Sequence, residues 1–134
     1  MRAGKLEGDE TVLVVDDDPQ VRTLLRSILS RHGYAVLVAE SAGDALLVSE
    51  QYAGVIDLLV SDVVMPRMTG PQLVQRLVLL RPTMAVLLCS AYADELAAGD
   101  GVQAPGHAFL AKPFSRDEIL RKVRQLLDAE AVTS

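Results

Sequence analysis

Four apolar runs of this sequence are followed directly by side chains that can bind a metal ion or a phosphoryl group. Asp16 and Asp17 follow the first run, Asp62 follows the third, Ser90 the fourth and Lys112 the fifth. Converging carboxylates repel one another unless a cation offsets their charge, and Mg²⁺, like Mn²⁺, prefers oxygen ligands. A carboxylate beside such an ion can form an acyl phosphate, while a hydroxyl and an ammonium group serve the phosphoryl oxygens. The set predicts Mg²⁺-assisted transfer of a phosphoryl group onto an aspartate.

Each of these residue types also has an ordinary structural role. Asp18 suits the N-cap of a helix, and a run of three acids is often a solvated turn. A serine at a strand end often bonds to nearby backbone, and a single lysine often faces solvent. What favours the functional interpretation is the conjunction: an acidic pair, an acid, a hydroxyl and a lysine each follow an apolar run, in that order.

The elements that must position these residues alternate along the chain. The predicted strands are residues 11–15, 35–39, 57–61, 84–89 and 107–111. The predicted helices run from 19 to 33, from 41 to about 52, from 71 to 81, over a short stretch at 95–98, and from 115 to about 127. Strands alternating with helices favour an α/β fold of three layers, with a parallel sheet between helices. The carboxyl ends of parallel strands share one edge of the sheet, where ligands bind, so the polar side chains can converge there.

Local signals mark the starts of several helices. Asp18 precedes a proline that suits the first helical position. Ser41 with Asp44, and Ser115 with Glu118, have the three-residue spacing of capping boxes. These pairs predict where the second and the last helix begin.

Composition indicates a single domain that needs no cross-links. The chain has 134 residues, half of them hydrophobic, and one cysteine, Cys89, expected as a buried, unreactive thiol. The net charge of −5 weighs against direct nucleic-acid binding. No apolar stretch approaches the roughly 20 residues that span a bilayer, so a cytoplasmic protein without membrane contact is expected. The domain is expected over residues 10–130, with 1–9 as a disordered lead-in or an artificial addition.

Five motifs resemble the receiver domain of bacterial two-component response regulators. They are VVDDDP at 14–19, SDVVMP at 61–66, MTG at 68–70, LCSA at 88–91 and FLAKPF at 109–114. The resemblance extends over about residues 10–130 and implies a CheY-like, flavodoxin-like (β/α)5 fold with strand order 2-1-3-4-5.

The resemblance also implies a role for each site residue. Asp62 corresponds to the phospho-acceptor, and Asp16 and Asp17 to the acidic pair that holds Mg²⁺. The backbone carbonyl of Val64 would be a further metal ligand. Lys112 would pair with the phosphoryl oxygens, and the peptide bond that follows it is typically cis in this family.

Two further residues correspond to the family's switch. Ser90 stands at the position of the switch hydroxyl and Phe109 at that of the switch aromatic. Phosphorylation would draw in the hydroxyl, turn the aromatic ring and change the surface of the fourth helix, fifth strand and fifth helix.

The partners implied are a sensor histidine kinase or a histidine phosphotransfer domain as phosphodonor, and an output protein or fused domain downstream. The chain would assist its own phosphorylation and dephosphorylation without being a conventional enzyme. It resembles receivers fused to hybrid sensor histidine kinases, so a stand-alone receiver and an excised one both remain open, as does a homodimer on phosphorylation. Val64, which cannot orient a water, and the bulky Tyr92 predict slow loss of the phosphoryl group.

Two alternatives belong to other classes. The run Asp16–Asp17–Asp18 also fits the Asp-x-Asp motif of haloacid-dehalogenase-like phosphatases, with Asp16 as nucleophile. That interpretation leaves Asp62 without a role, and no second acidic pair follows Lys112 where that family needs one. The other alternative is an interaction module of the same fold that works without phosphorylation, and the full set of site residues weighs against it.

Overall fold

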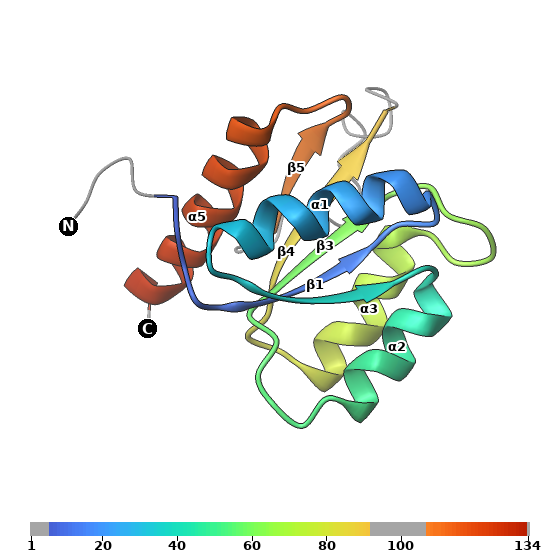
Figure 1. Cartoon of the computed structure of the whole chain (residues 1–134). Helices are drawn as coiled ribbons and strands as arrows, with labels where there is room; N and C mark the ends of the chain where they lie inside the picture. The colour runs from blue at the N-terminus through green and yellow to red at the C-terminus, as the bar shows by residue number, and fades with distance from the viewer. Residues whose placement is uncertain (1–5, 92–106, 134) are drawn as a thin grey trace.

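The computed structural model describes residues 6–91 and 107–133, and its centre is a sheet of five parallel strands (Figure 1). The strands are β1 (Thr11–Val15), β2 (Ala35–Ala39), β3 (Leu58–Asp62), β4 (Ala85–Ser90) and β5 (His107–Ala111). Their order, β2-β1-β3-β4-β5, is the predicted one. β1, β3 and β4 lie inside the sheet and are almost entirely buried, as their continuous apolar sequences require.

Helices cover both faces of the sheet and make the predicted three layers. On one face lie α1 (Pro19–Arg31) and α5 (Arg116–Thr133), and on the other α2 (Ala42–Gln51) and α3 (Gly70–Leu80) (Figure 1). The helix predicted at 95–98 lies outside the described residues. Within the described part of the chain, no helix has both the length and the apolar character that crossing a membrane requires.

The predicted caps open their helices. Asp18 accepts a hydrogen bond from the Gln20 N–H, and Ser41 accepts one from the Asp44 N–H. Ser115 and Glu118 exchange two bonds, at 2.7 and 3.1 Å. A further capping box, Thr69 with Gln72, opens α3 and was not predicted from the sequence.

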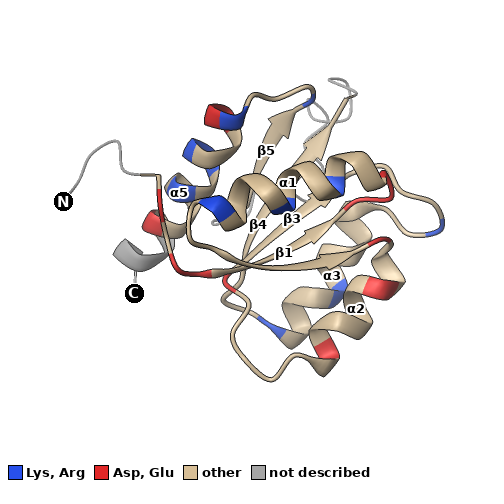
Figure 2. Cartoon of the chain, viewed as in Figure 1, with Lys and Arg blue, Asp and Glu red and all other residues tan. Residues whose placement is uncertain are grey.

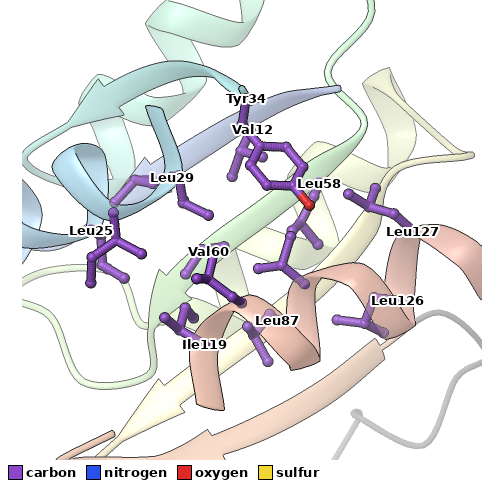
Figure 3. Close-up of a cluster of buried hydrophobic side chains, with 14 of the residues drawn as sticks. Val12, Leu25, Leu29, Tyr34, Leu58, Val60, Leu87, Ile119, Leu126 and Leu127 are labelled. Carbon is purple, nitrogen blue, oxygen red and sulfur yellow. The ribbon is translucent and has the colours of Figure 1, made fainter. Parts of the chain in front are cut away.

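Two apolar clusters, one on each face of the sheet, hold the layers together. Because side chains alternate along a strand, Val12 and Leu58 belong to the cluster under α1 and α5 (Figure 3), whereas Leu13 and Leu59 belong to the one under α2 and α3. Full burial of a side chain of this size contributes about 1.5–3 kcal/mol. These contacts fix the strand positions on which the site depends.

Two strands lie one residue later than predicted: β3 runs over Leu58–Asp62 and not over 57–61, and β4 over Ala85–Ser90 and not over 84–89. Asp62 is the last residue of β3 and pairs with Cys89, and Ser90 is the last residue of β4 and pairs with Ala111. Backbone hydrogen bonds make a strand, so a polar side chain does not end it. The two polar residues therefore sit on the sheet itself and not in the loops that follow.

The described residues that precede β1, 6–10, form hydrogen bonds with the rest of the domain. The Gly8 N–H donates to the His32 carbonyl at 3.0 Å, and the Tyr34 hydroxyl donates to the Leu6 carbonyl at 3.1 Å. These residues fall in the stretch 1–9 that was expected to be a disordered lead-in. The bonds attach this part of the stretch to the turn between α1 and β2.

Candidate functional site

Three carboxylates meet at the carboxyl edge of the sheet. β1 pairs with β3 so that Val15 lies opposite Ser61, and the residues that follow bring Asp16 and Asp17 beside Asp62. One oxygen from each of these three aspartates lies within 4.8 Å of the others. The turn between β1 and α1 carries this acidic character in Figure 2. The structure thus brings together the three acids that the sequence predicted as metal ligands.

Lys112 reaches this acidic cluster from β5. Its Nζ lies 3.1 Å from Asp16 Oδ2 and 3.4 Å from Asp62 Oδ1. The Lys112 side chain is 18% exposed and that of Asp62 is 14% exposed, so the pair lies largely out of solvent. The Lys112–Pro113 peptide bond is cis, as the resemblance implied.

The electrostatics of the cluster leave it short of positive charge. Burial raises the pKa of the Asp62 carboxyl, the Lys112 charge opposes this, and the charges of Asp16 and Asp17 add to the rise. Burial lowers the pKa of Lys112, but its hydrogen bond to Asp16 and the two carboxylate charges outweigh burial and leave that pKa raised. One ammonium group faces three carboxylates, so a second cation would relieve the repulsion.

The backbone of the β1–α1 turn is held by two bonds. The Asp18 N–H donates to Asp16 Oδ1 at 2.9 Å, and Arg22 Nη1 donates to the Asp16 carbonyl at 2.6 Å. The sequence did not predict this role for Arg22. The sequence held only a weak signal for it: Arg22 lies one helical turn after the cap, Asp18. From that position a side chain can reach back to the turn that precedes the helix.

The donor set fits a hard divalent ion. Asp16, Asp17 and Asp62 offer carboxylate oxygens, which suit Mg²⁺ and Mn²⁺, and the described part of the chain brings no sulfur or imidazole ligand to the cluster. Asp16 is only 2% exposed whereas Asp17 is exposed, so the cluster has one buried and one open side. Such an opening leaves room for the waters that Mg²⁺ keeps. Val64, 44% exposed, lies in the loop that follows Asp62.

Ser90 lies on β4, the strand next to β3, and Phe109 lies on β5, the edge strand beyond β4. Ser90 is buried, and its carbonyl accepts a hydrogen bond from the Lys112 N–H at 2.8 Å. Phe109 pairs with Leu88 and packs, half-buried, against the apolar cluster under α2 and α3. Both residues therefore lie on the strands that carry the site, whereas Tyr92 lies outside the described residues.

Cys89 pairs with Asp62 across the sheet but is buried. Its side chain is 2% exposed, and burial raises the pKa of its thiol to about 12. A thiol in this environment stays protonated and unreactive at neutral pH. The expectation of a buried cysteine is confirmed, and its lack of reactivity stays a prediction.

Comparison with known families matches most of the chain to one model. Residues 12–124 match the model described as the response regulator receiver domain. The match includes Asp16, Asp17, Asp62, Ser90 and Lys112.

Individual relatives come from several kinds of signalling protein. The chain is 36% identical to part of the sensor kinase CckA of Brucella abortus, covering 96% of this chain but only 14% of the kinase. It is 29% identical to the chemotaxis protein CheY of Bacillus subtilis, covering 87% of this chain and 97% of that protein. The solved receiver domain of the hybrid histidine kinase CckA superposes with a TM-score of 0.73 at 34% identity, over 87% of this chain and 98% of that one.

Proposed function

The chain belongs to the response regulator receiver domain family of two-component signalling, and from that membership we propose that it accepts a phosphoryl group on Asp62 and relays the event as a change of surface. The proposed donor is a phosphohistidine on a sensor histidine kinase or a histidine phosphotransfer domain. The proposed metal ligands are Asp16, Asp17, Asp62 and the carbonyl of Val64, around Mg²⁺ or Mn²⁺.

One observation supports this proposal more than any other. Asp62 shares a cluster of carboxylate oxygens within 4.8 Å with Asp16 and Asp17, and Lys112 Nζ lies 3.4 Å from its Oδ1. The acceptor, the metal ligands and the counter-charge thus come from three strands and meet around one carboxylate. A merely solvated acidic turn would not be expected to contact a partly buried lysine that follows the edge strand β5.

Phosphoryl transfer to Asp62 requires only one covalent step from the protein. An Asp62 carboxylate oxygen attacks phosphorus, the N–P bond of the phosphohistidine breaks, and its electron pair returns to the imidazole ring. A bound divalent ion supplies Lewis-acid stabilisation of the phosphoryl oxygens. Lys112, held by Asp16, keeps an ammonium group where charge develops in the loose transition state.

The proposed output is a shift between two conformations. A phosphoryl group on Asp62 adds negative charge and acceptor oxygens beside Ser90. Movement of the β4 loop towards it would make room for Phe109, which is half-buried next to β4. The faces of β5 and α5, with the fourth helix expected between 95 and 98, would then present a changed surface to an output protein or a fused domain.

The surface of α1 suits the approach of a phosphodonor. It begins beside the acidic turn and carries an open, shallow and mainly apolar strip, in which Leu24 is 53% exposed. The strip is lined by Pro19, Gln20, Thr23, Leu24 and Ser27. A helix of the donor laid along this strip would bring its phosphohistidine towards Asp62.

The remaining parts of the proposal concern the setting. We place the reaction in the cytoplasm, since the one cysteine is buried and unpaired, as a reducing compartment allows. The relatives include a kinase of which this chain spans 14% and a CheY of which it spans 97%, so attachment to a hybrid kinase and independent action both fit. Light scattering before and after phosphorylation tests a homodimer.

The deciding experiment uses acetyl phosphate and Mg²⁺ on the wild-type chain. We expect mass spectrometry to find one added phosphoryl group, mapped to Asp62, and Asp62→Asn to abolish it while circular dichroism shows the variant folded. Phosphate on Asp16 instead would favour the phosphatase alternative. No labelling, with no spectroscopic response to Mg²⁺ or beryllofluoride, would favour an interaction module that works without phosphorylation.

A further inference from the structure

Gly70 is the first residue of α3 and lies buried against the back of the acceptor strand. Its N–H donates to the carbonyl of Val63 at 2.8 Å. A methyl group at this position would lie 3.1 Å from the Val63 Cα and 3.1 Å from Leu88 Cδ2, and it would overlap the backbone carbonyl oxygen of Asp62. The glycine therefore touches the peptide group that carries the acceptor residue.

Space, and not backbone conformation, explains a glycine here. Among the glycines that the structure describes, Gly33 has a positive φ and Gly70 does not. Alanine forms helices better than glycine, so helix propensity alone would favour a side chain at Gly70. The close approach of the first turn of α3 to Asp62 is the feature that a side chain would prevent.

The acceptor peptide has little freedom to move aside. The Asp62 carbonyl accepts a hydrogen bond from Ser61 Oγ at 3.0 Å, and the Val63 N–H donates to the Cys89 carbonyl at 2.9 Å. Added volume at Gly70 must therefore displace either this peptide or the loop between Val63 and Gly70. The first displacement moves the acceptor carboxylate, and the second moves Val64, the proposed carbonyl ligand.

We propose that Gly70 is a positioning residue for phosphoryl transfer: the absence of a side chain lets α3 close on the Asp62 peptide and sets the acceptor against its cation partners. The proposal rests on the proposed function of Asp62. Gly70 itself touches neither the phosphoryl group nor the metal ion. It acts through the backbone position of Asp62 and of the loop that follows.

The test compares Gly70→Ala with Gly43→Ala. Gly43 is the second residue of α2, and its nearest contact for an added methyl is Ser41 Oγ at 4.0 Å. Both substitutions add the same atom to a glycine in the first turn of a helix, but only one faces the acceptor. Three quantities are measured for each: the melting temperature, the initial rate of Asp62 labelling by acetyl phosphate, and the dissociation constant for Mg²⁺ alone by calorimetry.

We expect Gly70→Ala to slow labelling by about tenfold or more, since displacements on the ångström scale cost up to about 10²-fold in rate. Its Mg²⁺ dissociation constant should rise several-fold, which a loss of stability alone would not produce in folded protein. Gly43→Ala should match the wild type in both. If Gly70→Ala is largely unfolded, both variants are measured in trimethylamine N-oxide, which favours burial, and rates are normalised to the folded fraction.

Two results separate this inference from the proposed function. A wild-type chain that acetyl phosphate does not label at Asp62 removes the proposed function. A wild-type chain that is labelled at Asp62, with Gly70→Ala matching Gly43→Ala in normalised rate and Mg²⁺ affinity, leaves the proposed function intact and overturns the role of Gly70.

Discussion

Lys112 and Asp16 form an ion pair at 3.1 Å although two strands, β3 and β4, separate the strands from which they extend. The same ammonium group lies slightly further, 3.4 Å, from Asp62. Lys112 therefore bridges Asp16, a proposed metal ligand, and Asp62, the proposed acceptor. Its position suggests that it partly offsets carboxylate repulsion before any other cation binds.

The first prediction concerns this bridging ammonium group. Lys112→Met should lower the rate of labelling by acetyl phosphate by about 10²-fold, the scale of one electrostatic contact to a transition state. Mg²⁺ should bind at least as tightly as in the wild type, because a competing positive charge has gone. Lys122→Met, on α5, is the control and should change neither quantity. Labelling at the wild-type rate in Lys112→Met would remove the catalytic role of Lys112.

The second prediction concerns metal binding and stability. Mg²⁺ at a hundred times its dissociation constant should stabilise the wild-type chain by about 2.7 kcal/mol, and chelation should reverse this. Because the pKa of Asp62 is raised in the folded state, its ionised form destabilises the fold at neutral pH without metal. Asp62→Asn should therefore melt higher than the wild type in chelator and gain less from Mg²⁺. Thermal unfolding with and without Mg²⁺ checks both, and equal gains in the two proteins would contradict the proposed ligand set.

The third prediction concerns an ion pair outside the site. Arg124 Nη2 lies 2.7 Å from Glu10 Oε2, and this hydrogen bond lowers the pKa of Glu10 against the opposing effect of burial. The folded state thus binds a proton less readily than the unfolded state, so the stabilisation is fully present above the unfolded-state pKa of 4.5 and is lost as pH falls through the lower folded-state pKa. Glu10→Gln should cost about 1–2 kcal/mol at pH 7, on the scale of a charged hydrogen bond.

Urea unfolding at pH 7 and at strongly acid pH measures this effect. The wild type and Glu10→Gln should differ at pH 7 and converge in acid, where Glu10 is protonated. Asp117→Asn serves as control, since Asp117 lies in an exposed pair with Arg121 whose atoms are 3.8 Å apart. A difference between wild type and Glu10→Gln that stays constant with pH would mean that the charge of Glu10 is not the cause.

The fourth prediction concerns the lifetime of the phosphoryl group. Val64 follows the acceptor by two residues, is 44% exposed and has no group that could orient a water. Val64→Asn should speed loss of phosphate from purified protein by about tenfold, below the 10²–10⁴-fold of a well-placed general base. The isosteric Val64→Thr, with one hydroxyl, should lie between the two. Rapid loss from the wild type, or no change in either variant, would reject slow hydrolysis as a property of Val64.

The fifth prediction concerns the backbone of the same loop. Arg67 has a positive φ of 74°, a left-handed conformation that costs a residue with a Cβ about 1–2 kcal/mol relative to glycine. Arg67→Gly should therefore raise the unfolding free energy by a few tenths of a kcal/mol or more, after the greater unfolded-state entropy of glycine is subtracted. Arg76→Gly, within α3, should lower it by about 1 kcal/mol. Urea titration of the two variants measures the contrast.

The strand ends and their polar residues were readable from the sequence because their signals are local. Continuous apolar runs mark buried parallel strands, and the capping pairs at Ser41 and Ser115 mark helix starts, so the convergence of Asp16, Asp62 and Lys112 followed from topology. Asp62 and Ser90 proved to lie on the strands themselves, since backbone pairing does not depend on the polarity of a side chain.

Only the tertiary structure could decide the contacts between distant segments. Arg124 donates a hydrogen bond to Glu10, 114 residues away in the sequence. Gly70 lies against the Asp62 peptide because of how α3 packs on the sheet. Neither contact has a periodic or compositional signal in the sequence. The partner of each charged side chain depends on how helices and strands pack in three dimensions. So does the position at which only a glycine fits. The sequence alone therefore determined which kind of site to expect, and the packed fold decided the geometry around Asp62.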